Sequence, residues 1–479
     1  MAGIIPGRSI PCPVRQMARQ DPHHPAIVLD DAILDYRTLD ERLNHLCQQL
    51  TAAGMHKGSQ LLTISANSIE LLLLSWACLR SGILFCPINP SLPQEKWQGL
   101  VSSLNMDGYW LAQDDGSTSL GDLRLTLSFD GTTESTGEIC LEPGQLASLT
   151  LTSGSSGESK AVAHYLQAHL ANAIGSAERI PVTQGDLWLL SLPLFHIGGY
   201  AIAIRCFTAG AAIALRSATL SLEQQLRQWP ITHLSLVPTQ LYRLFQAGLR
   251  LEQTRIRYLL LGGATIPDAL IGECRAQGIT PYVSYGLSEM GSQVCTRQAS
   301  AQGNNTGRPL PGREVRLDGE EICVRGETLF AGYYRDGQLQ LPLDEQGWFH
   351  TGDLGQFNPQ GELIITGRIG NRFISGGENI QPEEIEQQLV THPTIRQAMV
   401  VPLADAEWGA AAVAFIDSQS PLAFSELKQW LKQRLPRHLI PRHWLPWPDG
   451  HSGGLKPSRQ EFATLARGLL EARGFSAPD

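Results

Sequence analysis

The 479-residue chain lacks the cysteine spacing of a disulfide framework or of a thiolate zinc site. Its nine cysteines are odd in number, and no two of them are separated by only two residues. Scattered single cysteines are typical of small core residues in a reducing compartment. We therefore expect a cytoplasmic protein with unpaired thiols and assign no zinc site. A Gly-x-Gly sequence is also missing, which excludes the dinucleotide-binding fingerprint.

Long hydrophobic runs are missing as well. The most apolar stretch, 71–74 followed by Trp76, is far shorter than the roughly 20 residues that span a bilayer. The first residues show no basic stretch followed by a sustained apolar region, as a secretory leader would. We therefore expect no membrane span.

Positive charge is in deficit. The chain has 37 Lys and Arg against 46 Asp and Glu, which gives a formal net charge of −9 at pH 7. This balance excludes a protein that coats nucleic acid or anionic lipid by charge alone, so we expect no nucleic-acid partner. It leaves the oligomeric state open, with a homo-oligomer among the alternatives.

The rest of the composition is that of a globular protein, with 42% hydrophobic and 17% charged residues. The length exceeds what one hydrophobic core organises, since domains have about 150 residues each. A capping-box spacing at 38–41 and apolar residues at helical intervals up to 50 predict an early helix. Short apolar runs at 146–152, 187–192, 258–261 and 280–284 are each followed by small residues and a helix-like segment. This alternation predicts an α/β fold with ligands at the carboxyl ends of the strands.

The pattern changes after Arg368. Pro382 opens a predicted helix with acidic residues in its first turn, and apolar runs follow at 398–401 and 411–416. Leu427, Trp430, Leu431 and Leu435 mark one face of an amphipathic helix after Ser425. We predict a large N-terminal part, 1–368, and a small C-terminal α+β domain, 369–479, hinged near 369–371.

The most informative segment, 152–160, directly follows an apolar run. Its small residues and hydroxyls can surround an anion with N–H and O–H donors, and Lys160 adds a cation. Ser159 stands where the P-loop of kinases and GTPases needs its second glycine, so this is a different phosphate loop. In isolation, such a Ser/Gly segment is more often a flexible surface loop, and the phosphate interpretation depends on the motifs that accompany it.

Further motifs follow in order along the chain. They lie at 192–199 (LPLFHIGG), 260–264 (LLGGA), 285–290 (YGLSEM), 348–353 (WFHTGD), 366–368 (TGR), 376–380 (GGENI) and 453–456 (GGLK). In this order and at these intervals they resemble the motifs of the adenylate-forming superfamily, which includes acyl-CoA synthetases, peptide-synthetase adenylation domains and luciferases. Each motif is weak alone, whereas their order is specific. The resemblance implies a large multi-sheet AMP-binding part and a small mobile C-terminal domain.

The resemblance also implies a site for ATP and Mg²⁺. The implied nucleotide-binding residues are Thr152, Ser153, Gly154, Ser155, Ser156, Gly157, Lys160, Gly263, Ala264, Tyr285, Gly286, Ser288, Asp353 and Arg368. Tyr285 would stack on the adenine, Ser288 would bond the α-phosphate, and Asp353 would accept the ribose hydroxyls. Glu289 and Thr152 would hold Mg²⁺ through oxygen.

The implied catalytic residues are Lys456, Glu289 and His196. Lys456 corresponds to the mobile lysine that bridges the carboxylate and the α-phosphate, although a single lysine is by itself most often an exposed surface residue. Two positions depart from the family pattern: Ser159 replaces the usual proline before Lys160, and Gly370 replaces the usual aspartate or lysine at the hinge. A glycine at the hinge is compatible with domain rotation.

The expected acceptor is free CoA, because no carrier-protein domain follows Lys456. Three stretches, 192–199, 237–241 and 373–384, resemble the o-succinylbenzoate–CoA ligases of menaquinone biosynthesis. The implied reaction is ATP-dependent activation of 2-succinylbenzoate to its acyl-adenylate, followed by transfer to CoA. The alternative is a CoA ligase for another aryl or medium-chain acid. A non-catalytic adenylate-binding regulator is disfavoured by the presence of Lys456, Glu289 and Asp353, and nothing favours a luciferase-like enzyme.

The candidate acid-binding residues are His196, Arg205, Ser235 and Gly262. A dicarboxylate needs a cation or donors for the carboxylate that is not activated, and Arg205 is the candidate partner. A structural salt bridge at Arg205, core packing of His196 and a backbone-bonded hydroxyl at Ser235 remain alternatives.

Overall fold

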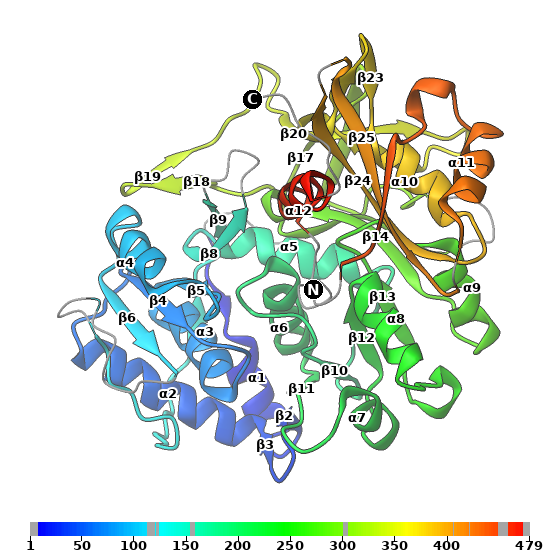
Figure 1. Cartoon of the computed structure of the whole chain (residues 1–479). Coiled ribbons are helices and arrows are strands. Elements are labelled where there is room, and N and C mark those ends of the chain that lie inside the picture. Colours follow the sequence, from blue (N-terminus) through cyan, green and yellow to red (C-terminus); the bar gives the residue numbers. More distant parts are fainter. Residues whose placement is uncertain are drawn as a thin grey trace.

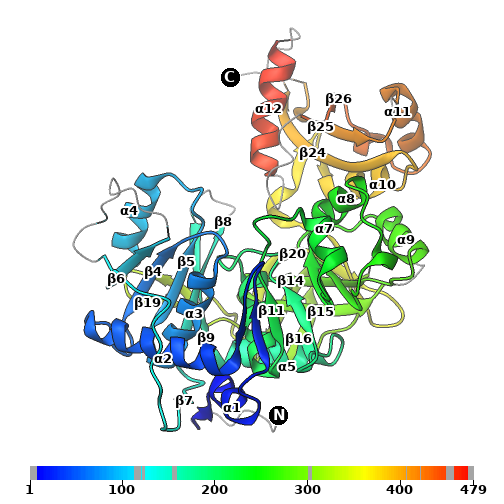
Figure 2. The same ribbon diagram turned by 90° about the horizontal axis from the view of Figure 1, so that it is seen from below.

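The computed structural model describes residues 8–112, 120, 124–153, 159–299, 305–405, 407–420, 422–448 and 458–472. A large N-terminal part contains two big sheets, and a smaller C-terminal part sits beside α8 and α9 (Figures 1 and 2). The mixed α/β class and the division into a large and a small part confirm the prediction. Among the described helices, none is both long and apolar enough to cross a membrane.

One large sheet has seven strands in the order β19-β18-β9-β8-β5-β4-β6. Its parallel strands alternate with helices, whereas β8 and β9 form an antiparallel hairpin. The strands are β4 (Gln60–Ile64), β5 (Leu84–Ile88), β6 (Gly108–Leu111), β8 (Leu146–Ser153), β9 (Ser159–Tyr165), β18 (Gly332–Arg335) and β19 (Gln338–Gln340). The associated helices are α2 (Tyr36–Ala52), α3 (Ile69–Ser81) and α4 (Gln94–Ser103).

The other large sheet has eight strands in the order β15-β14-β13-β12-β10-β11-β2-β3, and its centre is parallel. Its strands are β2 (Pro25–Val28), β3 (Ile33–Asp35), β10 (Leu187–Leu189), β11 (Ala212–Ala214), β12 (His233–Leu236), β13 (Tyr258–Leu261), β14 (Tyr282–Leu287) and β15 (Ser292–Gln298). Its helices are α5 (Leu166–Ala177), α6 (Ile197–Ala209), α7 (Leu222–Gln228), α8 (Pro238–Gln246) and α9 (Asp268–Ala276).

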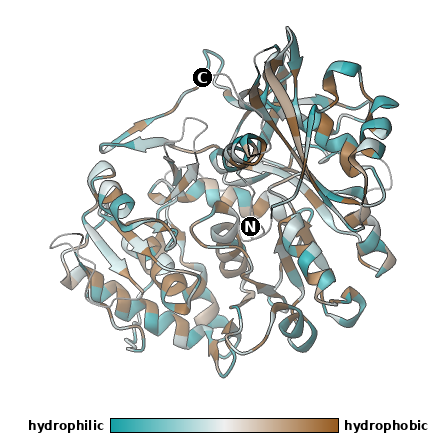
Figure 3. Cartoon of the chain, viewed as in Figure 1, coloured by the Kyte–Doolittle hydropathy of each residue, from teal (hydrophilic) through white to brown (hydrophobic). Residues whose placement is uncertain are grey.

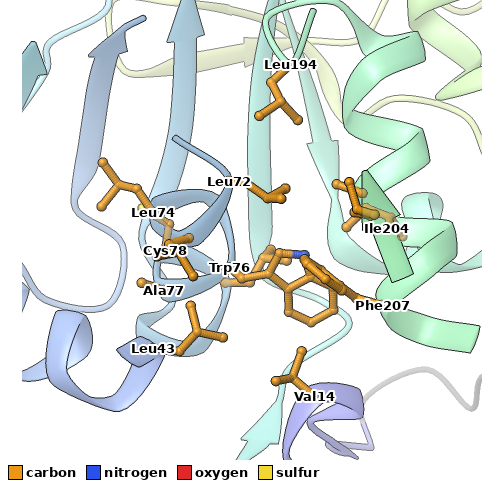
Figure 4. Close-up of a cluster of buried hydrophobic side chains, with 14 of the residues drawn as sticks. Val14, Leu43, Leu72, Leu74, Trp76, Ala77, Cys78, Leu194, Ile204 and Phe207 are labelled. Carbon is orange, nitrogen blue, oxygen red and sulfur yellow. The ribbon is translucent and has the colours of Figure 1, made fainter. Parts of the chain in front are cut away.

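Helices α3 and α6 join the two large sheets into one core. Trp76 of α3 meets Phe207 of α6 edge to face, with ring centroids 4.8 Å apart (Figure 4). Both rings are almost fully buried, and aromatic pairs in this geometry stabilise a core beyond the area they bury. The four consecutive leucines that begin at Leu71 are all buried here, which explains why this apolar stretch is a core helix.

A four-stranded sheet and a short linker lead to the C-terminal part. The sheet is β16 (Arg313–Asp318), β17 (Glu321–Gly326), β20 (Phe349–Phe357) and β21 (Leu363–Arg368), and the 3₁₀ turn Ile369–Asn371 follows. The C-terminal part comprises β22 (Phe373–Ser375), β23 (Glu378–Ile380), α10 (Pro382–Val390), β24 (Ile395–Asp405), β25 (Gly409–Ser418), α11 (Phe424–Lys432), β26 (His443–Pro446) and α12 (Arg459–Glu471). The remaining elements are β1 (Ile10–Pro11), α1 (Pro13–Gln20), β7 (Cys140–Leu141) and the 3₁₀ turns Leu251–Gln253, Ser288–Met290 and Arg437–Leu439.

The C-terminal part has its own hydrophobic core. Leu427 and Leu431 of α11 pack toward α10, and Phe415 of β25 meets Phe462 of α12 edge to face at 4.9 Å. The helices carry hydrophilic and hydrophobic residues on different faces (Figure 3), as amphipathic elements that cover a sheet must. The C-terminal part contacts the large part through Arg396 of β24, whose guanidinium lies 5.4 Å from the Tyr242 ring of α8.

Most predicted elements are confirmed, with three differences. The early helix begins at Tyr36, and its cap is Asp35, whose carboxylate accepts from the Thr38 amide at 2.8 Å, so the predicted capping box at 38–41 is wrong. The run at 146–152 continues into the hairpin partner β9 and not into a helix. The run at 280–284 likewise leads through a short 3₁₀ turn into antiparallel β15. An apolar run by itself does not show whether a helix or an antiparallel strand follows it.

Candidate active site

A cavity of about 1570 Å³ opens at the carboxyl ends of the parallel strands β10, β12, β13 and β14. Its walls also include β20, β21 and the hairpin β8–β9. Fourteen predicted site residues line it: Thr152, Lys160, His196, Arg205, Ser235, Gly262, Gly263, Ala264, Tyr285, Gly286, Ser288, Glu289, Asp353 and Arg368. The structure thus brings together residues that lie more than 200 positions apart in the chain.

The remaining predicted residues are Ser153, Gly154, Ser155, Ser156, Gly157 and Lys456. Gly154, Ser155, Ser156, Gly157 and Lys456 lie outside the described residues. Ser153 is the last residue of β8. The predicted phosphate loop therefore begins and ends in strands.

Thr152 and Lys160 face each other across the β8–β9 hairpin. Their residues are paired in the antiparallel register, and the Thr152 hydroxyl donates to the Lys160 carbonyl at 3.4 Å. The Lys160 ammonium lies 4.7 Å from the centre of the Tyr333 ring of β18. This contact places a cation at the base of the Ser/Gly segment.

Two glycines shape the floor of the cavity. Gly263, just after β13, has a φ of +81°, a conformation that favours glycine. A Cβ at Gly286 would lie 2.0 Å from the Ser292 carbonyl oxygen, so only glycine allows β14 and β15 to approach here. The bare backbone leaves room for a flat ligand beside the strand ends.

A chain of polar contacts links three motifs at one end of the cavity. The buried Tyr285 hydroxyl donates to Asp353 Oδ2 at 2.8 Å, and Arg368 Nη1 lies 3.3 Å from Asp353 Oδ1. Asp353 and Arg368 are paired across β20 and β21, so the sheet register positions this ion pair. Burial raises the pKa of Tyr285 well above its usual value, and the Asp353 carboxylate adds to the shift. Tyr285 therefore remains a neutral donor.

Glu289 is held by a residue that the motifs did not point to. The Tyr333 hydroxyl donates to Glu289 Oε1 at 2.8 Å. Burial, followed by the nearby Glu289 charge, raises the pKa of Tyr333, so it too remains a donor. One ring thus contacts both Lys160 and Glu289.

The turn that presents Asp353 is fixed by Glu321 of β17. Glu321 Oε1 accepts from the Gly352 amide at 2.9 Å, and Oε2 accepts from His350 Nδ1 at 2.9 Å. His350 Nε2 lies 3.6 Å from Asp344 Oδ2 on its other side. The hydrogen bond to Glu321 raises the pKa of His350 above its ordinary value. The Asp353 amide donates to Thr351 Oγ1 at 3.0 Å.

The cavity wall also contains a buried cation. Arg205 of α6 is only 4% exposed, and its Nη2 donates to the neutral Asn172 Oδ1 at 2.7 Å. Among the described residues no carboxylate pairs with it, so the structural salt bridge considered for Arg205 is not found there. Burial, aided by repulsion from Arg313, lowers the pKa of Arg205 to about 9.

His196 and Ser235 line the same cavity as Arg205. His196 immediately precedes α6, and its ring centroid lies 4.8 Å from that of Phe195. The Ser235 hydroxyl is buried and has no hydrogen-bond partner within the part of the chain that is described. The backbone-bonded alternative for Ser235 is therefore not observed, and a buried hydroxyl without a partner is available to a ligand.

Two family models match the sequence: the AMP-binding enzyme model over residues 14–334 and the AMP-binding enzyme C-terminal domain model over residues 384–449. The chain belongs to the AMP-binding enzyme family. This AMP-binding enzyme is 38% identical over 441 residues to the 2-succinylbenzoate–CoA ligase of Salmonella typhimurium, covering 91% of this chain and 93% of that protein.

Solved structures resemble this AMP-binding enzyme over nearly its whole length. A variant of Escherichia coli MenE with bound OSB-AMS has a TM-score of 0.86 and 34% identity, covering 97% of this chain and 99% of that one. The o-succinylbenzoate coenzyme A synthetase of Bacillus subtilis in complex with ATP and magnesium ion has a TM-score of 0.81 and 27% identity, covering 92% and 96%.

The sequence motifs of this AMP-binding enzyme did not predict several residues that shape the site. Tyr333, Glu321, Asn172 and Arg313 lie outside the motifs, in segments with ordinary strand or helix patterns. No local signal marks them, because each acquires its role from a partner far away in the chain.

Proposed function

We propose that this AMP-binding enzyme is an ATP-dependent 2-succinylbenzoate–CoA ligase of menaquinone biosynthesis. It converts 2-succinylbenzoate and ATP to the acyl-adenylate and pyrophosphate, and then transfers the acyl group to CoA with release of AMP. The observation that carries the proposal is the buried Arg205 guanidinium in the wall of the same cavity as Asp353 and Glu289. A cation there suits an acid with a second carboxylate.

The nucleotide is assigned to the end of the cavity that contains Tyr285, Asp353 and Arg368. Asp353 would accept the ribose hydroxyls, Gly263 and Ala264 would lie against the adenine, and Tyr285 would stack on it. Ser288 and Gly286 would contact the α-phosphate. Lys160, with Thr152, Ser153, Gly154, Ser155, Ser156 and Gly157, would bind the β- and γ-phosphates through N–H, O–H and ammonium donors.

The residues present fit Mg²⁺. Glu289 supplies a carboxylate inside the cavity, and Tyr333 holds one of its oxygens, so the carboxylate is oriented before a cation arrives. The Thr152 hydroxyl is the second proposed ligand. Mg²⁺ held there would neutralise phosphate charge, and Tyr333 keeps the Glu289 carboxylate in place.

Lys456 is proposed as the lysine that stabilises the charge on the reacting carboxylate and α-phosphate. It belongs to the proposed C-terminal domain, 369–479, which follows the 1–368 part at the 3₁₀ turn Ile369–Asn371. The separate hydrophobic cores on the two sides support this boundary. Rotation about Gly370 would exchange Lys456 for the β22–β23 hairpin, which would border the pantetheine of free CoA.

The acid is assigned to the end that contains His196, Arg205, Ser235 and Gly262. His196 would contact the carboxylate being activated, and Arg205 and Ser235 would bind the second carboxylate. A ligase for a monocarboxylic aryl or medium-chain acid is the alternative. Such an acid would leave the buried guanidinium without a counter-charge, which is unfavourable in an apolar setting. We place the enzyme in the cytoplasm, in keeping with its nine free cysteines.

The test is ATP- and CoA-dependent AMP release with 2-succinylbenzoate, benzoate, coumarate and octanoate at matched concentrations. We expect a kcat/KM for the dicarboxylate at least about 100-fold above those of the others, because a pocket built around a charged partner rejects acids that lack it. A higher kcat/KM for any monocarboxylate would overturn the choice of acid and leave adenylate formation standing.

A further inference from the structure

Asn172 contacts both Arg205 and the turn that carries Ser288 and Glu289. It lies on α5 and is 1% exposed. Its Oδ1 accepts from Arg205 Nη2 at 2.7 Å, and its Nδ2 donates to the Met290 carbonyl at 3.5 Å. Met290 ends the 3₁₀ turn that carries Ser288 and Glu289. A single amide therefore contacts both the buried cation and the turn of the nucleotide end.

A second buried arginine packs on the same helix. Arg313 is 6% exposed, its Nε donates to the Gln293 carbonyl at 2.8 Å, and its Nη2 donates to the Asn172 carbonyl at 3.4 Å. A Cβ at Gly175 would lie 2.1 Å from Arg313 Nη1, so glycine is needed for the guanidinium to lie against α5. Arg205 and Arg313 are close enough to repel each other.

The acceptors around these two guanidinium groups are neutral. The described hydrogen bonds of Arg205 and Arg313 go to an amide side chain and to backbone carbonyls, and the Arg205 guanidinium also lies 5.8 Å from the centre of the Trp188 ring. The Glu327 carboxylate stabilises the charge of Arg313, whereas no described carboxylate pairs with Arg205. Neutral acceptors satisfy the N–H groups of Arg205 but leave its positive charge uncompensated, and buried charge without a partner is unfavourable. The Arg205 Nε has no hydrogen-bond partner among the described residues. Arg205 also lines the cavity, so an anion that enters can supply what is missing.

We propose that Asn172 is a positioning residue that determines specificity for a dicarboxylic acid. Its neutral amide fixes the direction of Arg205 without neutralising it, and Arg313 adds positive potential behind, so the second carboxylate of the acid becomes the counter-ion. The inference rests on the proposed function in one respect, namely that the acid lies at Arg205. An aspartate at position 172 would have the same shape and would itself pair with Arg205.

The experiment compares the diacid with two matched monoacids, each lacking one of its carboxylates: 4-oxo-4-phenylbutanoate and 2-butanoylbenzoate. AMP release and kcat/KM are measured for the full-length wild type, Asn172→Asp and Asn172→Ala. The readout is the ratio of kcat/KM for 2-succinylbenzoate to that for the better monoacid. This ratio cancels general losses of active enzyme, which a merely structural role would produce.

We expect Asn172→Asp to lower this ratio by about 10- to 100-fold, because a hydrogen bond to a charged group is redirected from the substrate to the protein. Asn172→Ala should lower it by about tenfold, since Arg205 stays charged and loses only its orientation. The KM for ATP should change by less than about threefold, because the 3.5 Å contact to Met290 is long and weak. Ser176→Ala, a buried change one turn along α5, is the matched control and should leave the ratio unchanged.

A double-mutant cycle makes the test independent of folding yield. In an Arg205→Met background, Asn172→Asp and Asn172→Ala should have no effect on the ratio, because the group that Asn172 positions is gone. An unchanged ratio in Asn172→Asp, or equal effects with and without Arg205, would overturn the inference and leave the ligase assignment intact. If the wild type itself does not prefer the diacid, the choice of acid fails instead.

Discussion

The proposed nucleotide end and the proposed acid end of the cavity differ in how their charged groups are paired. At the nucleotide end, opposite or complementary groups are already paired: Tyr285 with Asp353, Asp353 with Arg368, and Tyr333 with Glu289. At the acid end, Arg205 is buried against a neutral amide. A site whose groups are mutually satisfied is organised before ligand arrives, whereas an uncompensated cation selects for a ligand that brings the missing charge.

The residues of the two proposed ends are also distributed differently along the chain. The nucleotide end is made from short contiguous motifs, and β20 and β21 bring Asp353 opposite Arg368 by simple strand register. The acid end needs α5, α6 and the start of β16 to converge, through residues 172, 205 and 313. Contiguous motifs suit the binding of a nucleotide, which many enzymes share. An acid site made of residues from three separate elements can vary with the acid that is bound.

The largest expected effect is at Lys456, which is proposed to act where the two ends meet. Lys456→Ala should reduce acyl-adenylate formation by about 10²- to 10³-fold, because one preorganised contact to developing charge is lost. Pyrophosphate release reports this step. Transfer to CoA from a supplied acyl-adenylate should continue at a similar rate. Equal losses in both half-reactions would contradict a role confined to adenylation.

The next largest effect tests whether the two proposed ends bind their ligands independently. Arg205→Met removes the buried cation while keeping an apolar stem, and should lower kcat/KM for 2-succinylbenzoate by about 100-fold, the cost of leaving a desolvated carboxylate unpaired. The KM for ATP should stay within about twofold, because the nucleotide contacts are intact. A parallel rise in the KM for ATP would mean that the ends are not separable.

Tyr333→Phe tests the nucleotide end alone. It removes the hydroxyl that orients Glu289 and should raise the Mg²⁺ concentration needed for half-maximal activity by about tenfold, the value of one hydrogen bond to a charged group. Isothermal titration of Mg²⁺ into the ATP-bound enzyme measures Mg²⁺ affinity without the acid substrate, and it should fall by a similar factor. The diacid-to-monoacid ratio should remain that of wild type, and a change in it would show that Tyr333 also acts on the acid.

The smallest effect concerns pH and the turn before Asp353. Since Glu321 raises the pKa of His350 in the folded state, the folded protein binds this proton more tightly than the unfolded chain. The resulting stabilisation is complete below the ordinary histidine pKa of about 6.5 and is lost as pH rises through the raised value. The Tm difference between wild type and His350→Gln should therefore shrink between pH 6 and pH 9. A constant difference would contradict this linkage.

The positions of the strands and the nucleotide motifs could be predicted because their signals are local. A run such as Tyr258–Leu261, followed by glycines, has few conformations other than a buried strand and a tight turn. The expected start of the early helix was wrong because Asp35, and not Thr38, supplies the capping oxygen. Either residue can cap a helix, and the pairing of β2 with β3 decides where the chain turns.

The sequence by itself determined the order of elements, the glycine turns and the motifs proposed to bind a nucleotide, because each depends on neighbours a few residues apart. Only the tertiary structure decided that Tyr333 would hold Glu289, that Glu321 would fix the Asp353 turn, and that Asn172 would leave Arg205 charged. These contacts join residues 31 to 44 positions apart, and their strength depends on burial and distance, which arise only when separate elements pack together.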